Sequence, residues 1–166
     1  MMTIRYATLT DIPQILAIYN HAVLTSTASY DIEPHTFAMR LAWFADKERN
    51  GQPVFVIEDE DGVAGFGTYG PFREKIGYRF TVEHSIYIAE GKRGMGMGKL
   101  LLQKLIDSAT ESGYHVMIAG IDSSNELSLK FHRSFGFEEV AHFREVGHKF
   151  GQWLDVIFLQ KMLQPE

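Results

Sequence analysis

The strongest chemical signal in this chain is a dense group of glycines, in the run Arg93-Gly94-Met95-Gly96-Met97-Gly98-Lys99. Glycine has no Cβ, so closely spaced glycines allow the backbone to approach a ligand closely. A helix that begins at such a loop offers unpaired N–H groups and the positive end of its dipole, which suits a phosphate group. The pattern therefore predicts a phosphate-binding loop, with a ligand-free glycine-rich turn as the alternative.

Two familiar phosphate-binding loops do not match this run. A P-loop needs a glycine five residues before its Gly-Lys-Ser/Thr, whereas Arg93 stands at that place before Gly98, and Leu100 follows Lys99. A dinucleotide fingerprint, Gly-x-Gly-x-x-Gly, needs a third glycine where this chain has lysine or leucine. The spacing that remains is Arg-x-x-Gly-x-Gly, formed by Arg93, Gly96 and Gly98.

The elements that position this loop follow from hydrophobic periodicity. Thr10 is the predicted N-cap of a first helix that ends near residue 24, and Phe37, Leu41 and Phe44 share one face of a second. Two more helices are predicted over residues 98–111 and 125–135, and strands over residues 2–7, 54–58, 63–69, 78–89, 115–121, 137–146 and 153–162. This order predicts an α/β fold with a mixed central sheet and helices on both faces.

Length and composition limit the function classes. A chain of 166 residues favours one domain, residues 1–166, and 45% hydrophobic residues are enough for a sizeable core. No apolar run approaches the roughly 18 residues of a membrane span, and the first residues lack a signal-peptide pattern. The net charge of −5 is negative, whereas a surface that binds nucleic acid is positively charged. We therefore expect a soluble, cytoplasmic protein without nucleic-acid or membrane partners.

A second motif lies further along the chain, in the segment from Asn125 to Phe137. Asn125 can cap the predicted helix and still turn its amide toward a ligand. Ser128 leaves space beside that ligand, and Gly136 suits the left-handed residue that ends a helix. Each motif alone is weak, but the two together, in this order of strand and helix, are hard to obtain by chance.

Together these segments resemble the GCN5-related N-acetyltransferase (GNAT) family, which has the GNAT acyl-CoA N-acyltransferase fold. The resemblance implies that the amides of the glycine run cradle the pyrophosphate of acetyl-CoA, the co-substrate. It also implies that the strand before the loop splays from its neighbour and frees backbone groups for the pantetheine arm. The cofactor contacts implied in this way are Ile86, Tyr87, Ile88, Arg93, Gly94, Met95, Gly96, Met97, Gly98, Lys99, Asn125 and Ser128.

Further segments are similar to the phosphinothricin and methionine sulfoximine acetyltransferase branch of this family. They are Ile18–Val23, Thr81–Ser85 and Gly147–Asp155, together with His132 at a position where most relatives carry tyrosine. The resemblance covers nearly the whole chain. It implies acceptor contacts at Arg73, Glu74, Lys75, Glu83, His84 and Ser85.

Acetyl transfer to an amine needs a group that accepts a proton from the amine and one that protonates the departing thiolate. Glu83 is the predicted base, acting directly or through water, because it lies only three residues before Ile86 and so near the acetyl end of the cofactor. His132 is the second predicted catalytic residue, since imidazole transfers protons at neutral pH. The structural alternatives are a glutamate that faces solvent or pairs with an arginine, and a histidine packed at the sheet edge.

Two further features narrow the mechanism. Cysteine is absent, which excludes a thiol nucleophile, and His21, His84 and His148 lack a metal-ligand spacing, so no metal is predicted. We therefore expect direct attack of the amine in a ternary complex. Arg73 is the predicted partner of a substrate carboxylate, because a guanidinium pairs with a carboxylate in a forked geometry, and Arg79 is a second candidate.

These residues predict an N-acetyltransferase that transfers acetyl from acetyl-CoA to the α-amino group of a small amino acid analogue, such as methionine sulfoximine, methionine sulfone or phosphinothricin. Two alternatives stay open: acetylation of another amine, a polyamine or a protein N-terminus, and a non-catalytic acyl-CoA-binding module. A polyamine would favour an acidic pocket, whereas Arg73 and Arg79 flank this one. The family resemblance suggests a homodimer. Tyr30 is predicted either to wall the acceptor pocket or to pack in the core.

Overall fold

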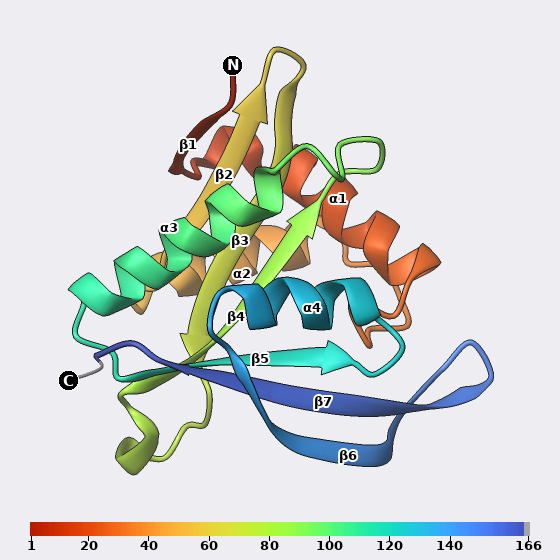
Figure 1. Ribbon diagram of the computed structural model, residues 1–166. Helices are drawn as coiled ribbons and strands as arrows, with labels where there is room; N and C mark the ends of the chain where they lie inside the picture. The colour runs from red at the N-terminus through yellow and green to blue at the C-terminus, as the bar shows by residue number, and fades with distance from the viewer. Residues whose placement is uncertain (165–166) are drawn as a thin grey trace.

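A computed structural model describes residues 1–164. Its seven strands form one sheet in the order β1-β2-β3-β4-β5-β7-β6 (Figure 1). The strands are β1 (Thr3–Tyr6), β2 (Val54–Asp59), β3 (Gly62–Pro71), β4 (Thr81–Ile88), β5 (Val116–Asp122), β6 (Glu138–Lys149) and β7 (Gln152–Met162). Neighbouring strands are antiparallel except β4 and β5, which are parallel. The predicted mixed sheet is confirmed.

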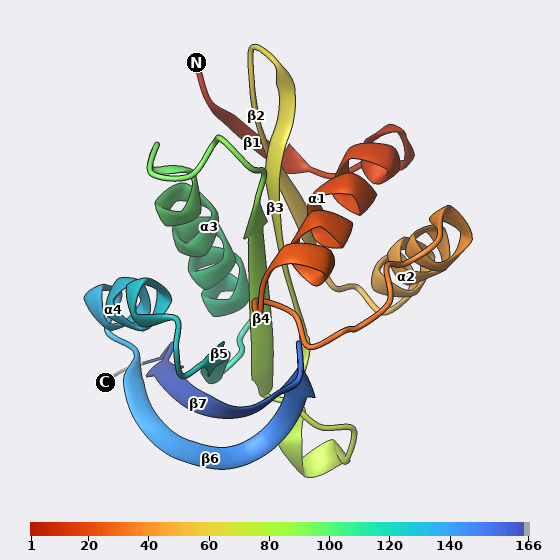
Figure 2. The ribbon, with the colours of Figure 1, turned by 90° about the vertical axis from the view of Figure 1, so that its right-hand side faces the viewer.

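Four helices cover the sheet on both faces, as predicted. They are α1 (Ile12–Thr25), α2 (Phe37–Arg49), α3 (Met97–Glu111) and α4 (Glu126–Ser134). Figure 2 shows α1 and α2 on one face and α3 and α4 on the other. Each face has its own buried cluster: α3 packs on one with Leu101, Leu102 and Leu105, and α1 packs on the other with Ile12 and Ile15. No helix within residues 1–164 is both long and apolar enough to cross a membrane.

The parallel pair β4–β5 separates after three residue pairs. Its ladder ends at Glu83 opposite Ile118, although β4 continues along β3 to Ile88 and β5 continues along β7 to Asp122. The two strands therefore diverge as a V, visible in Figure 1 as the angle between β4 and β5. We call the point at Glu83 and Ile118 the apex of the V. Beyond the apex, the β5-facing backbone groups of β4 have no strand partner among the described residues.

The start of the first helix differs from the prediction. A one-turn helix, η1 (Leu9–Asp11), precedes α1, and the N-cap of α1 is Asp11 rather than Thr10. The cause is a capping box in which the Thr8 N–H donates to the Asp11 carboxylate at 2.8 Å. The Arg5 guanidinium donates to the same carboxylate, also at 2.8 Å, so Asp11 is held where the helix begins.

The buried face of α2 also differs from the prediction. Phe37 and Leu41 are exposed, whereas Arg40 and Phe44 are only 2% and 3% exposed. Arg40 is buried because its guanidinium carbon lies 4.1 Å from the ring centre of Tyr19 and close to a second aromatic ring on α2. Cation–π stacking of this kind allows an arginine to occupy a buried position of a helix. Hydrophobic periodicity does not predict such a position, because it counts only apolar residues as buried.

Several element bounds differ from the prediction by one to three residues. β4 begins at Thr81 rather than at residue 78, because residues 76–78 form a one-turn helix, η2 (Ile76–Tyr78). β6 extends to Lys149 across an irregularity between Phe143 and Gly147. α3 begins one residue before the predicted start, because Gly96 is its N-cap.

Candidate active site

The glycine run forms an open loop between β4 and α3. Gly94 and Gly96 have φ angles of +79° and +85°, in the left-handed region that favours glycine. A Cβ built at either residue would meet nothing within 4 Å. Glycine is therefore required there by the backbone angle, and the space beside the loop is free.

The first turn of α3 follows this loop directly. Its first three N–H groups, at Met97, Gly98 and Lys99, precede the first intrahelical bond, which the Leu100 N–H donates to the Gly96 carbonyl oxygen at 3.3 Å. The Met97 side chain is 1% exposed and packs in the core, so only its backbone N–H can serve a ligand. The loop thus presents backbone donors and the positive end of a helix dipole.

The strand before the loop presents backbone at the edge of the V. Ile86, Tyr87 and Ile88 lie beyond the apex and pair with β3 on one side only. Ile86 and Ile88 pack against the α3 cluster, and Tyr87 packs against the α1 cluster. Their side chains are thereby anchored, which leaves their backbone groups as the available contacts.

Asn125 caps α4 as predicted. Its side-chain oxygen accepts a hydrogen bond from the Ser128 N–H at 3.1 Å. Gly136 follows the helix with a φ of +86°, the left-handed conformation expected of a helix end. Ser128 lies one turn before His132, and its hydroxyl oxygen is 3.4 Å from the His132 Nδ1.

Glu83 occupies the apex of the V. By strand alternation its side chain shares a face with Tyr87, on the α1 side of the sheet. It has no ion-pair partner within residues 1–164, so the alternative of an arginine-paired glutamate does not hold. Burial raises its pKa, which makes the carboxylate a stronger base.

Gly120 is a position that the sequence prediction missed. A Cβ there would lie 3.3 Å from the Glu83 Oε2 and 3.2 Å from the Phe158 ring. Any larger residue would therefore crowd the carboxylate. The signal in the sequence was a glycine inside an otherwise apolar strand, which indicates a close approach by another group.

His84 and His132 meet on the opposite face of the sheet. Their Nε2 atoms are 3.0 Å apart. The His84 Nδ1 lies 3.2 Å from the Ile118 carbonyl oxygen, and the His132 Nδ1 lies 2.7 Å from the Ser128 carbonyl oxygen. Burial lowers the pKa of both rings, to about 3 for His84, so both are neutral at pH 7.

Strand alternation points the His84 ring away from the face that carries Glu83, and its acceptor contact stays a prediction. Both ring nitrogens of His132 contact protein atoms, and its catalytic role stays a prediction as well. The two predicted catalytic residues, Glu83 and His132, thus flank the V from opposite faces.

The predicted acceptor loop is exposed. Arg73, Glu74 and Lys75 lie in the β3–β4 connection with exposed side chains. Gly70 of β3 pairs with Glu83 of β4, and Arg73 follows Gly70 by three residues. At about 3.3 Å per extended residue, the Arg73 backbone lies roughly 10 Å from Glu83 along the strand direction. Ser85 follows Glu83 on the same face of β4 by alternation.

The two candidate arginines differ in their contacts. The Arg73 guanidinium carbon lies 5.3 Å from the ring centre of Phe72 and faces solvent. Arg79 donates to the Ile76 carbonyl oxygen at 3.1 Å and stacks on Phe80 at 4.5 Å. Arg73 is therefore the freer of the two for a ligand carboxylate.

Tyr30 connects the α1–α2 loop to the far strands of the sheet. Its hydroxyl donates to the Asp122 carboxylate at 2.5 Å, at the end of β5. Its ring covers Gly147, where a Cβ would come within 2.5 Å of a ring carbon. Lys149 donates to the Ser29 carbonyl oxygen at 2.6 Å and holds the same loop. Asp122 is two residues after Gly120, so both lie on the face of the sheet that carries Glu83. Tyr30 therefore covers the end of β5 on that face.

Comparison with known proteins identifies the family. A model of the acetyltransferase (GNAT) domain matches residues 4–158. This chain belongs to the GNAT acetyltransferase family. The L-methionine sulfoximine/L-methionine sulfone acetyltransferase of Pseudomonas aeruginosa is 46% identical over 164 residues, which cover 98% of this chain and 95% of that protein. The phosphinothricin N-acetyltransferase of Streptomyces coelicolor is 34% identical over 156 residues, covering 92% and 91%.

Solved structures agree with this assignment. A Salmonella typhimurium protein, described with its cofactor acetyl-CoA, superposes on this GNAT domain with a TM-score of 0.95 and 43% identity, covering 99% of this chain and 95% of that one. The predicted family, branch resemblance and GNAT fold are thus confirmed.

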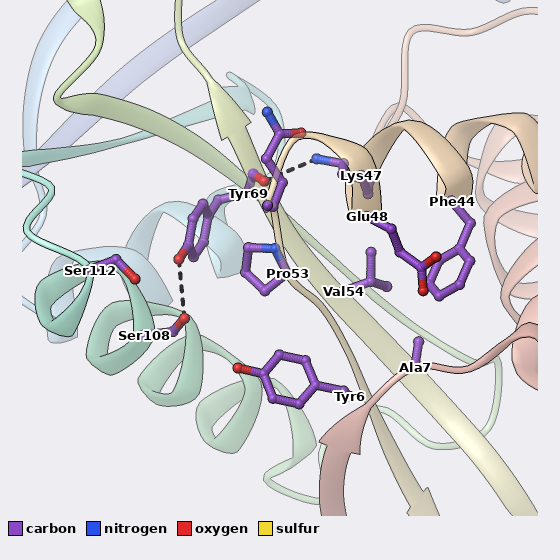
Figure 3. A pocket seen from close by; sticks show the side chains of 12 residues that line it. Tyr6, Ala7, Phe44, Lys47, Glu48, Pro53, Val54, Tyr69, Ser108 and Ser112 are labelled. Carbon is purple, nitrogen blue, oxygen red and sulfur yellow. Dashed lines mark hydrogen bonds between the residues drawn. The ribbon is translucent and has the colours of Figure 1, made fainter.

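A cavity of about 370 Å³ lies away from the V in this GNAT domain (Figure 3). It is lined by Tyr6, Ala7, Phe44, Lys47, Glu48, Gly51, Gln52, Pro53, Val54, Tyr69, Ser108 and Ser112. Lys47 donates to the Tyr69 carbonyl oxygen at 3.0 Å, and burial lowers its pKa to about 8. None of the predicted site residues borders this cavity. Within residues 1–164 no three histidine or acidic side chains are grouped to hold a metal ion.

Proposed function

We propose that this GNAT domain, residues 1–166 acting as one domain, is an acetyl-CoA-dependent N-acetyltransferase. Its acceptor is the α-amino group of a small amino acid analogue: methionine sulfoximine, methionine sulfone or phosphinothricin. One observation carries the proposal: the V opens at Glu83 and leads along β4 to the open glycine loop. The activities by which the methionine sulfoximine and phosphinothricin acetyltransferases are named support the acceptor class.

The described residues fit acetyl-CoA. The N–H groups of Met97, Gly98 and Lys99, which precede the first intrahelical bond of α3, suit its pyrophosphate. The edge at Ile86–Ile88 suits the amides of its pantetheine arm. Asn125 and Ser128 lie at the start of α4, on the other side of the V. When bound, acetyl-CoA supplies the acetyl thioester, and this end of the molecule lies toward the apex if the pyrophosphate lies at the loop.

Glu83 is then placed to accept the amine proton. It stands at the apex, partly buried and without an ion-pair partner in the described chain. Since burial raises its pKa, the carboxylate holds a proton more readily than an exposed glutamate. Proton removal, directly or through one water, makes the nitrogen a nucleophile for direct attack.

Turnover with a panel of amines tests this function. Release of free thiol from acetyl-CoA is measured with methionine sulfoximine, methionine sulfone, phosphinothricin, methionine and spermidine. We expect the first three to react well above methionine, because methionine lacks the tetrahedral polar groups and leaves pocket donors unpaired. Comparable rates for methionine sulfoximine and spermidine would contradict the acceptor assignment, and no thiol release with any amine would contradict the enzyme assignment.

Replacing Arg73 with alanine should remove most of the preference for a substrate carboxylate. A guanidinium–carboxylate contact contributes roughly 1.5–3 kcal/mol, and ~1.4 kcal/mol is tenfold. We therefore expect kcat/KM for methionine sulfoximine to fall about 10- to 150-fold, with little change for its decarboxylated analogue. Arg79→Ala is the matched control, since Arg79 is engaged by its own loop. Equal losses of kcat/KM for methionine sulfoximine and for its decarboxylated analogue would show that Arg73 does not recognise the carboxylate.

We also propose that the protein works in the cytoplasm as a homodimer. Large apolar side chains are exposed on β6, β7 and their turn: Val140, Phe143, Val146, Phe150 and Trp153. A patch of this kind suits a second copy of the chain. Sedimentation equilibrium should give twice the mass of one chain for the wild-type protein. Trp153→Glu should lower the measured mass toward that of one chain. If the wild-type protein has the mass of one chain at micromolar concentration, the proposed dimer is contradicted.

A further inference from the structure

The glycine loop between β4 and α3 has few side-chain contacts with the rest of the protein. Lys92 is partly buried, whereas the other residues from 90 to 96 are exposed. Within residues 1–164, the side chains of this segment have polar contacts at two places. Glu90, whose side chain is 79% exposed, lies 3.4 Å from the His21 Nε2, and Lys92 binds two aspartates. The position of the loop therefore depends mainly on Lys92.

Lys92 joins the glycine loop to the turn between β2 and β3. Its Nζ donates to the Asp59 Oδ2 and to the Asp61 Oδ2, at 2.7 Å in each case. The turn and the loop lie at the same end of the sheet (Figure 1). We call Lys92, Asp59 and Asp61 the Lys92 cluster.

Both sides of the Lys92 cluster are held by backbone contacts. The Asp59 Oδ1 accepts a hydrogen bond from the Asp61 N–H at 2.9 Å, and Asp59 pairs with Gly62 across the turn. The Lys92 N–H donates to the Ala89 carbonyl oxygen at 3.1 Å, directly after β4. The hydrogen bond from Lys92 holds the pKa of the Asp59 carboxyl below its usual range, and the aspartates raise the pKa of Lys92. Lys92 and Asp59 are therefore both charged at pH 7.

The loop needs such a contact because of its glycines. Gly94 and Gly96 follow Lys92 closely, and glycine has more backbone freedom than any other residue. A loop that is ordered only when its ligand binds loses affinity in proportion to the fraction of molecules that are in the binding conformation. We propose that Lys92 is a positioning residue for acetyl-CoA, and that through Asp59 and Asp61 it holds the loop in the conformation that binds the pyrophosphate. The proposal rests on the proposed function, which places the pyrophosphate at this loop.

The alternative role is a direct contact between the Lys92 ammonium and a phosphate group. The two roles predict opposite effects of the aspartates. If Lys92 binds phosphate directly, removing an aspartate charge frees the ammonium and makes the loop more positive, so acetyl-CoA should bind more tightly. If the Lys92 cluster positions the loop, the same change should weaken binding. The geometry favours positioning, because two of the three ammonium hydrogens are donated to the aspartates.

Substitutions in the Lys92 cluster measure its effect on cofactor affinity. We expect the Kd and the KM for acetyl-CoA to rise about threefold to tenfold in Lys92→Met and in Asp59→Asn, with kcat within about twofold. Asparagine keeps an oxygen that accepts the Asp61 N–H, so the turn is retained. Asp61→Asn should have a smaller effect, because the Asp61 side chain is 72% exposed and that of Asp59 is 11% exposed. Lys92→Arg should recover the affinity, since a guanidinium can donate to both carboxylates.

Glu60→Gln is the matched control. Glu60 lies between the two aspartates, is exposed and has no ion pair within residues 1–164. Its substitution changes the net charge as Asp59→Asn does, but acetyl-CoA affinity should stay unchanged. Lys92→Met combined with Asp59→Asn should bind no more weakly than Lys92→Met alone, because both changes remove the same interaction. Tighter binding by Asp59→Asn, or unchanged binding by Lys92→Met, would overturn the proposal.

A measurement on the ligand-free protein tests the loop itself. Proton–nitrogen heteronuclear NOE values report picosecond to nanosecond motion of each backbone N–H. The values of Gly94 and Gly96 should fall in Lys92→Met and in Asp59→Asn, and should match the wild type in Glu60→Gln. Unchanged values in Lys92→Met would overturn the proposal whatever the affinities are. Absence of acetyl-CoA binding by the wild-type protein would instead contradict the proposed function, and the NOE values would still decide whether the Lys92 cluster holds the loop.

Discussion

Replacing Glu83 with glutamine should lower kcat by about 10²- to 10⁴-fold, the usual contribution of a positioned general base. Glutamine keeps the size of the side chain beside Gly120 but cannot accept a proton. Acetyl-CoA affinity should stay unchanged, because the loop at Gly96 that is proposed to bind the cofactor lies at the other end of β4. Steady-state kinetics and calorimetry measure the two effects separately.

The pH dependence of this variant follows from the amine and from Glu83. As the pH rises, more of the amine is already neutral, so the loss caused by Glu83→Gln should shrink. Burial raises the Glu83 pKa, so activity of the wild-type protein should fall on the acid side at a pH above the ordinary range of a glutamate, and this limb should vanish in the variant. Glu111→Gln, at an exposed position on α3, is the control. Full activity of Glu83→Gln at pH 7 would assign Glu83 a structural role.

Replacing Gly96 with valine should weaken acetyl-CoA binding by roughly 10- to 150-fold. At a φ of +85° a β-branched residue is strained, so the loop must change its backbone angles and turn its N–H groups away from a phosphate. The loss of one charge-assisted contact of roughly 1.5–3 kcal/mol corresponds to this range. Isothermal titration with acetyl-CoA measures the change.

Gly113→Val separates strain from binding. Gly113 has the same φ of +85°, and a Cβ there also meets nothing within 4 Å, but it lies after the end of α3, away from the loop. Both variants should lose a similar amount of unfolding free energy, of order 1–3 kcal/mol, whereas only Gly96→Val should lose affinity. Unchanged affinity in Gly96→Val would remove this loop from the proposed cofactor site.

Most elements were predictable because their signals are local. Capping by Asn125, the left-handed glycine at 136 and the period of α3 each depend on residues within one or two helical turns. Where long-range contacts intervene, the prediction failed. Arg40 took a core position on α2 because aromatic rings from two helices stack on it, and Asp11 replaced Thr10 as the cap because Arg5 holds its carboxylate.

The sequence by itself determined the family, the mixed sheet and the position of the glycine loop, since spacing along the chain sets backbone angles and helix starts. Only the tertiary structure decided the chemistry around the apex. Gly120 makes room for Glu83 from a different strand, and His84 meets His132 across 48 positions of sequence. Proton positions and pKa shifts depend on such distant contacts and on burial, because hydrogen bonding and loss of solvent act through space rather than along the chain.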